Sequence, residues 1–227
     1  MGNEYDPEPR KQLIALLNAG IPSINCEGDE SSDLYIIKSP LHFKPFISKL
    51  LQKHSSTIVI QYKSIKAISE LFHSFFQTSP SEEDNFSLGH SITIVVDPEQ
   101  LSELSVDSTK LIQILRIISL KHGCSIISIK NLNNVTDIKN IDKLIKLEKQ
   151  DVKPNFEDLS INEDDLLLYI PSTWDSWNKI ILHGNSTILG DDENNDGIIR
   201  NEQDLRNIDE KYEDYLTNDD PNKDWLS

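Results

Sequence analysis

The sequence predicts an α/β fold with a mainly parallel sheet and helices on both of its faces. Short runs rich in β-branched residues alternate with helical patterns of about ten to fifteen residues, which is typical of βαβ units. The chain has 227 residues, 37% of them hydrophobic, and is long enough to bury a core. We expect an α/β domain over residues 1–189 and an acidic tail over 190–227 that is partly helical or disordered.

The first half of the chain is predicted from its hydrophobic spacing and its turn residues. In chain order the expected elements are a helix over 7–18, an acidic turn over 26–32, a strand over 34–37, a helix over 43–52, a strand over 57–60 and a helix over 64–77. Gly20 and Pro22 mark the end of the first helix. The run at 57–60 is dense in β-branched residues and indicates a buried strand.

The second half is predicted in the same way. Its expected elements are a polar loop over 79–88, a strand over 92–96, a helix over 108–122, strands over 125–129, 166–170 and 179–183, and helices over 140–150 and 205–216. Ser108 is suited to cap the start of its helix, and Gly123 follows the end. His122, in the last turn, is predicted as a cation at the helix terminus.

The charge distribution excludes several classes of partner. The formal charge is −16, and residues 191–224 hold thirteen acidic and four basic side chains, which is −9 of that total. A strongly negative tail repels nucleic acid, so no nucleic-acid partner is expected. No run approaches the roughly 18 apolar residues needed to span a bilayer, and the polar N-terminus has no signal-peptide core. Cys26 and Cys124 are read as buried free thiols, so the expected compartment is the cytoplasm.

The motifs of catalysis and cofactor binding are missing from the sequence. Eight glycines form no glycine-rich phosphate loop, and the six histidines include no metal-binding pair spaced four apart. No nucleophile elbow is present either. We therefore expect no catalytic residue, no bound nucleotide or other cofactor, and no metal.

One acidic segment is similar to a calcium-binding loop. Residues 192–203 place oxygen-bearing side chains at the first, third and fifth positions and Gly197 at the sixth. The twelfth position is Gln203, which cannot supply the bidentate carboxylate that such a loop needs. An acidic linker is the favoured interpretation, and calcium binding remains the alternative.

Several segments, taken in order, resemble the dynein light intermediate chains. The similar segments are 86–96 (FSLGHSITIVV), 111–123 (LIQILRIISLKHG) and 168–180 (LYIPSTWDSWNKI), with weaker similarity at 34–60 and at the acidic end 218–226. The most specific segment is the Ile-Pro-x-x-Trp-Asp turn near Trp174. The resemblance implies a Ras-like, P-loop-type fold.

Two departures from the family pattern imply a pseudo-GTPase. Upstream of Leu34 the N-terminal strand and phosphate loop have no recognisable counterpart. The base-reading motif falls on Asp97, Pro98, Glu99 and Gln100, which lack the lysine and the final carboxylate. The sequence also ends before the long C-terminal region of animal members, so the resemblance does not extend to adaptor binding by that region.

The resemblance implies a small, divergent, fungal-type light intermediate chain. It would be a non-catalytic subunit of cytoplasmic dynein that binds the heavy-chain tail and supports microtubule-based transport in the cytoplasm. The residues expected to bind the partner are Tyr169, Trp174, Asp175, Trp177 and Lys179. Trp174 equally suits the end of the domain core, whereas Trp177 is the better candidate for an exposed anchor. The alternatives are a GTP/GDP-binding protein and an unrelated α/β adaptor or assembly factor.

Overall fold

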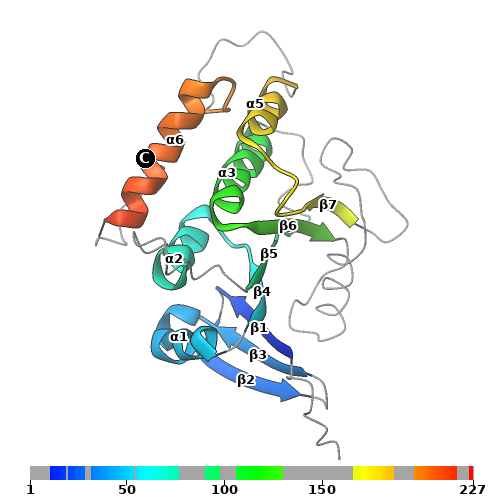
Figure 1. Ribbon diagram of the computed structural model, residues 1–227, viewed down its shortest axis with the longest axis vertical. Coiled ribbons are helices and arrows are strands. Elements are labelled where there is room, and N and C mark those ends of the chain that lie inside the picture. The colour runs from blue at the N-terminus through cyan, green and yellow to red at the C-terminus, as the bar shows by residue number, and fades with distance from the viewer. Residues whose placement is uncertain are drawn as a thin grey trace, which may run out of the picture.

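The computed structural model describes residues 11–18, 20–28, 32–53, 55–76, 90–97, 106–129, 166–186, 197–218 and 225–226. Within these ranges the chain forms a seven-stranded sheet of order β2-β3-β1-β4-β5-β6-β7 (Figure 1). Strands β3, β1, β4, β5 and β6 are parallel to one another, while β2 and β7 run antiparallel at the two edges. The predicted α/β fold with a mainly parallel sheet is confirmed.

The elements have the following bounds. The strands are Lys11–Leu17 (β1), Ser23–Gly28 (β2), Ser32–Lys38 (β3), Ser56–Gln61 (β4), Ser91–Val95 (β5), Cys124–Ile129 (β6) and Leu166–Ile170 (β7). The helices are the short 3-10 turn Pro40–Phe43 (η1), then Lys44–Lys53 (α1), Ile65–Phe75 (α2), Val106–His122 (α3), Trp177–Ser186 (α5) and Glu202–Thr217 (α6).

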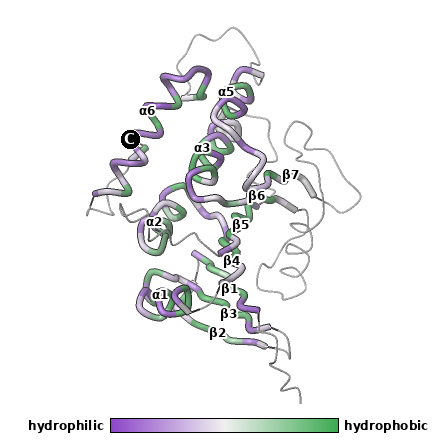
Figure 2. Tube along the Cα trace, in the orientation of Figure 1, coloured by the Kyte–Doolittle hydropathy of each residue, from purple (hydrophilic) through white to green (hydrophobic). Residues whose placement is uncertain are grey.

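The register of the sheet gathers alternate side chains into one core. Ile14 of β1 lies opposite Ile58 of β4, which lies opposite Ile92 of β5. Together with apolar residues of α1, α2 and α3, this row forms the main hydrophobic cluster. Side chains on the opposite face, such as Leu13 and Val59, are buried as well. The strands accordingly carry mostly hydrophobic residues (Figure 2), as expected for a sheet buried on both faces.

The N-terminal segment corrects two predictions. The sequence predicts a helix over 7–18, whereas Lys11–Leu17 form β1, between β3 and β4 in the sheet. A strand buried on both faces is a continuous apolar run, and periodicity alone does not separate such a run from a short buried helix. The acidic turn predicted from residue 26 begins within strand β2, which pairs with β3. The N-terminal strand, for which the sequence analysis found no counterpart, is therefore present as β1.

The C-terminal segment corrects a third prediction and confirms another. Residues 179–183, predicted as a strand, belong to helix α5. The helix predicted over 205–216 is present as α6, and the Asn201 side chain caps it by accepting from the Asp204 N–H at 2.9 Å. Tyr212 and Tyr215 of α6 are buried in the main cluster. The loop predicted over 79–88, the helix over 140–150 and the domain boundary at 189/190 lie outside the described residues.

Three side-chain predictions are also corrected. Cys26 is exposed on β2, whereas Cys124 is buried as predicted, and both are free thiols. Ser108 is not the N-cap of α3, because the helix begins at Val106. His122 is not a terminal cation, because its pKa is lowered to about 4, mainly by burial and also by the nearby Lys121 charge.

Candidate functional site

The turn between β7 and α5 contains most of the side chains predicted to bind a partner. It closes with a hydrogen bond of 3.1 Å from the Trp174 N–H to the Pro171 carbonyl. Ser176 then caps the start of α5. Its hydroxyl accepts a hydrogen bond of 3.4 Å from the Lys179 N–H, as an N-cap does. This cap starts a helix where the sequence predicts a turn leading into a strand.

A buried ion pair joins the turn to α3. The Nε and Nη2 atoms of Arg116 donate to the two carboxylate oxygens of Asp175, each at 2.7 Å. The two side chains are 0% and 5% exposed, respectively. One of the same oxygens also accepts a bond of 2.8 Å from the Ser176 N–H. Two parallel charge-assisted bonds fix both the position and the direction of the carboxylate, so the turn is held firmly on α3.

Trp174 lies between this ion pair and Lys179. The Nζ atom of Lys179 is 3.8 Å from the centre of the indole ring and donates to the Trp174 carbonyl at 2.5 Å. The guanidinium carbon of Arg116 is 6.0 Å from the same ring centre. The indole is half-buried and packs against the main hydrophobic cluster. Trp174, Asp175 and Lys179 therefore form one cluster that faces the domain interior.

The imidazole of His183 is neutral at pH 7 and lies near the same cluster. The pKa of its imidazole is lowered to about 4, mainly by burial and also by the positive charge of Arg116, while Asp175 partly opposes both effects. A neutral His183 adds no second positive charge next to the buried guanidinium of Arg116.

Trp177 and Tyr169 lie apart from that cluster. The Trp177 side chain is 37% exposed at the start of α5, beside a groove of about 330 Å³ between α5 and α6. Ile181 and Leu205 contribute apolar surface to this groove. Tyr169 is 3% exposed and pairs with Ile127 on the sheet face opposite the main cluster. Of the five predicted residues, Trp177 is thus the one that presents a large apolar surface outward.

A buried amide ties the segment just before α6 to α3 and α5. The Gln113 side chain of α3 donates to the carbonyls of Ile180 and Ile199, both at 2.8 Å, and accepts from the Ile199 N–H at 2.9 Å. Gly184 permits this arrangement, because a Cβ atom there would lie 2.1 Å from the Ile199 carbonyl oxygen. Helix α5 and the segment before α6 are therefore packed closely together beside the groove.

Sequence reasoning missed Arg116 and Gln113. Both interrupt the apolar run LIQILRIISL of α3, and both are completely buried. Charged and amide side chains are rarely buried unless they are paired, so polar residues within an apolar helix indicate a specific partner elsewhere in the chain. That signal was available in the sequence, but it could not name Asp175 or the Ile199 backbone as the partner.

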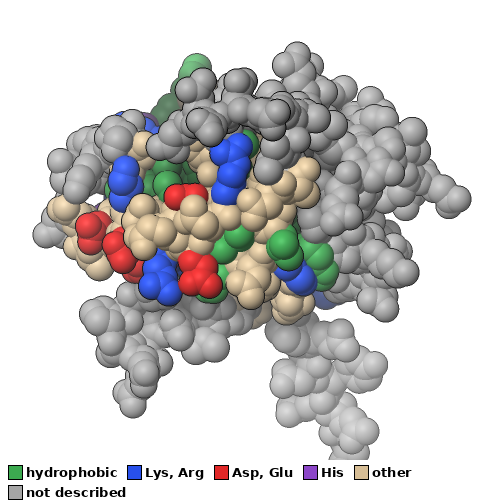
Figure 3. Space-filling model, turned by 90° about the horizontal axis from the view of Figure 1, so that it is seen from above, with side chains coloured by type: hydrophobic (Ala, Val, Ile, Leu, Met, Phe, Trp, Pro, Cys, Tyr) green, Lys and Arg blue, Asp and Glu red, His purple; other side chains and the backbone are tan. Residues whose placement is uncertain are grey.

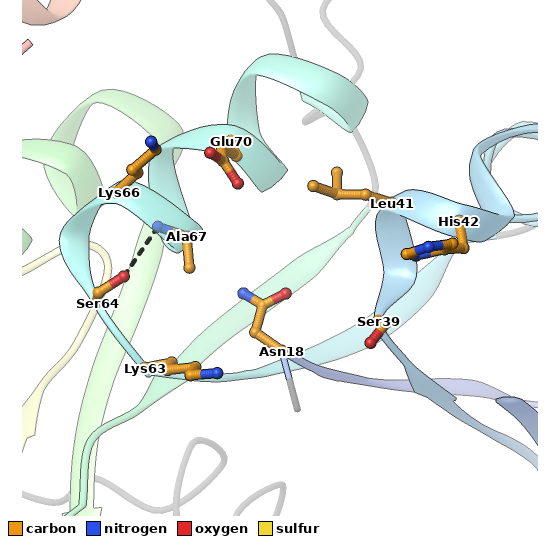
Figure 4. A pocket seen from close by; sticks show the side chains of 9 residues that line it. All are labelled: Asn18, Ser39, Leu41, His42, Lys63, Ser64, Lys66, Ala67 and Glu70. Atoms are coloured by element: carbon orange, nitrogen blue, oxygen red, sulfur yellow. Dashed lines mark hydrogen bonds between the residues drawn. The ribbon is translucent and has the colours of Figure 1, made fainter. Parts of the chain in front are cut away.

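A separate pocket of about 420 Å³ lies at the carboxyl ends of β1, β3 and β4 (Figure 4). Ligands of open α/β sheets usually bind at this edge. Asn18, Ser39, Lys63 and Lys66 are among the side chains that line it. The connection from β1 to β2 spans only residues 18–22, without the glycine-rich turn and helix that cradle phosphates.

The base-reading and calcium predictions fall mostly outside the described residues. Asp97 is exposed, and 98–100 lie outside the described residues; of the loop 192–203, only the part from Gly197 onward is described. Gly197 has a φ of 77°, and Gln203 donates to Asn207 within α6. In the part of the chain that is described, no three His, Cys, Asp or Glu side chains gather as a metal site, and no helix could span a membrane.

No protein-family model and no curated protein matches the sequence. Among solved structures, the chain is similar to the crystal structure of the conserved domain of the dynein light intermediate chain. The two are 16% identical, the alignment covers 96% of this chain and 95% of the other, and the TM-score is 0.54. The fold of this chain is therefore that of the dynein light intermediate chain's conserved domain.

Proposed function

We propose that this chain is a non-catalytic light intermediate chain of cytoplasmic dynein, which binds the heavy-chain tail through Trp177. The observation that carries the proposal is the shared fold over 96% of the chain, joined by the turn that holds Trp177 outward. In such a complex the chain acts in the cytoplasm on microtubule-associated dynein and supports transport without chemistry of its own.

The geometry of the turn supports a binding role for Trp177. An anchor residue is most effective when its position is fixed before the partner arrives, because less conformational entropy is then lost on binding. The Arg116–Asp175 pair and the Ser176 cap fix the start of α5. Trp177 is the first residue of that helix. Its indole offers a large apolar surface, of the kind enriched among residues that dominate interface energies.

The test is co-purification of the full chain with a heavy-chain tail fragment. We expect Trp177→Ala to keep the melting temperature of the parent chain and to weaken heavy-chain binding at least about tenfold, the effect of losing roughly 1.4 kcal/mol. Leu182→Ala is the matched control, because Leu182 is on the same helix and is 64% exposed. Equal binding by the parent and Trp177→Ala chains would remove Trp177 from the interface.

Guanine-nucleotide binding is the second candidate, and one observation favours it. The pocket in Figure 4 lies where open α/β sheets bind ligands, and two lysines line it. Extraction of the purified chain followed by chromatography distinguishes the two functions. A pseudo-GTPase yields no nucleotide, whereas one GDP or GTP per chain would establish the second candidate. Mass spectrometry of co-purifying proteins tests the remaining alternative, an unrelated adaptor.

A further inference from the structure

The charge of this acidic chain is reversed over one continuous stretch. Residues 34–69 contain no Asp or Glu and six lysines, although the whole chain carries −16. The stretch forms β3, η1, α1, β4 and the first turn of α2. Of these elements, β3, η1 and α1 lie at the end of the molecule away from α5 and α6 (Figure 1), whereas α2 contacts α6. We call the surface formed by η1, α1 and the start of α2 the basic face.

Helix α6 has the contrary charge. Helix α6 carries six acidic and two basic side chains, a net charge of −4. Acidic and basic side chains stand side by side on the end of the molecule seen in Figure 3. The net charge of the chain is therefore a poor description of what a partner meets, because at physiological salt charges act over about 8 Å.

The lysines of the basic face are exposed, and two of them line a pocket. Lys44 and Lys49 of α1 are exposed, as are Lys63 and Lys66 next to the start of α2. Lys63 and Lys66 line the pocket of about 420 Å³ described above. The N-terminus of α2 adds a positive dipole end to the same wall. In Figure 4 the two lysines are on the α2 side of the pocket, and Glu70 is the acidic side chain drawn with them.

Apolar surface accompanies these charges. Leu41 lines the pocket opposite α2. Phe46 of α1 is 36% exposed and meets the ring of Tyr35 edge-on, with the ring centres 6.0 Å apart. A hollow with lysines on one wall and apolar side chains beside it suits a segment that offers both carboxylates and an apolar side chain.

We propose that the basic face binds an acidic segment of a protein partner, with carboxylate side chains placed against Lys63 and Lys66. This surface lies away from Trp177, so the proposal stands independently of the proposed function. The sequence has no arginine between Lys11 and Leu115, so the positive charge of the basic face comes from lysine ammonium groups, which act on an anion as compact point charges.

The distribution of charge also favours a peptide over larger polyanions. A nucleic acid or an anionic bilayer extends well beyond the basic face and meets the rest of an acidic molecule, which repels it. A short acidic segment contacts the basic face alone. A flat bilayer also cannot enter a hollow bounded by η1 and α2, whereas a peptide side chain can.

The test uses a short fluorescein-labelled peptide rich in glutamate, with one leucine, titrated with the full chain and followed by fluorescence anisotropy. We expect binding that weakens as ionic strength rises, since the Debye length falls from about 30 Å at 0.01 M to about 8 Å at 0.15 M. Lys63→Glu with Lys66→Glu should weaken binding at least about tenfold. The matched control is Arg206→Glu with Lys211→Glu, which makes the same change of charge at two exposed positions of α6.

Each outcome decides the proposal. Loss of peptide binding in the Lys63/Lys66 variant, with binding kept in the Arg206/Lys211 variant and unchanged melting temperatures in both, supports it. An equal loss in both variants would show a general effect of net charge and overturn it. Tighter binding to phosphatidylserine vesicles or to a polynucleotide than to the peptide would also overturn it. The heavy-chain assay of Trp177→Ala is separate, so either proposal can fail alone.

Discussion

The guanidinium of Arg116 has no exposed surface, so its charge is balanced within the protein, and Asp175 provides the balancing carboxylate. Removing one member of a buried pair leaves the other charge uncompensated, which costs more than the net stabilisation that the pair provides. A side chain that was predicted for partner binding therefore has a structural task that binding assays alone would not separate from recognition.

Asp175→Ala is expected to lower the free energy of unfolding by about 3–5 kcal/mol, because it leaves the buried Arg116 charge unpaired. Urea unfolding followed by circular dichroism measures the change. Asp214→Ala, at an exposed position of α6, is the control and should stay within about 0.5 kcal/mol of the parent. If the two variants unfold at the same urea concentration, Arg116 is not held as described.

Gly184→Ala is expected to destabilise the chain although alanine is the better helix former. The propensity gain is about 1 kcal/mol, whereas the new Cβ meets the Ile199 carbonyl oxygen at 2.1 Å and Gln113 Nε2 at 2.6 Å. Overpacking of this kind costs about 1–3 kcal/mol. Thermal unfolding should show a lower midpoint for Gly184→Ala than for Leu182→Ala on the same helix. A raised midpoint would mean that the segment before α6 is not packed against α5.

At the scale of single residues, the sequence indicates burial better than it indicates partners. Trp177 is exposed, as its prediction as an anchor requires, and Trp174 packs toward the core, one of its two predicted settings. Arg116 and its carboxylate are 59 residues apart. Nothing local connects them, because the contact exists only once β7 has been added beside β6.

The docking of α6 shows how an acidic, weakly hydrophobic helix is held. Tyr212 donates to or accepts from His122 at 2.9 Å, and the His122 ring stacks on Phe72 with ring centres 4.2 Å apart. Lys121 pairs with Asp209 at 2.8 Å and with Glu213. Trp225 packs against Tyr212 and donates to Ser69 at 3.0 Å. Buried aromatic contacts therefore fix a helix whose composition alone favours disorder.

Stability should fall on acidification through the pKa of His122. That pKa is about 4 in the folded chain and about 6.5 in an unfolded one. Between these values the unfolded chain binds more protons, so the free energy of unfolding falls by roughly 2 kcal/mol from pH 7 to pH 5. Urea unfolding at several pH values measures this. His122→Gln should reduce the dependence without abolishing it, because the pKa of His183 is also lowered to about 4. His42→Gln, at an exposed position, should leave the dependence unchanged, and equal slopes in the two variants would contradict the assignment.

At the scale of elements, predictions succeed where two signals agree and fail where one signal is ambiguous. Helix α2 has both an amphipathic face and Ser64 as its N-cap, whose hydroxyl accepts from the Ala67 N–H at 3.2 Å. Strand β1 has only an apolar run. The apolar residues near the start of α5 fit a strand equally well, and the capping role of Ser176 depends on a turn oriented by Arg116.

For the whole molecule, the order of elements carries most of the information that the sequence offers about function. The parallel sheet follows from alternating strands and helices, and the resemblance to dynein light intermediate chains agrees with the fold found. The basic face does not follow from composition, because a net charge of −16 conceals an acid-free stretch of the chain. Only the fold places the lysines of that stretch on one face, so the proposal of an acidic partner depends on the structure.

The three hydrogen bonds of Gln113 have a practical consequence for labelling this chain. They hold Ile180 of α5 and Ile199, just before α6, to the same point of α3. Lengthening a connection between two anchored ends costs little, about 0.6 kcal/mol for each doubling of its length. The connection between Ser186 and Gly197 is therefore the place to insert a fluorescent domain or an affinity tag for purifying assembled complexes, with both termini left in their native form.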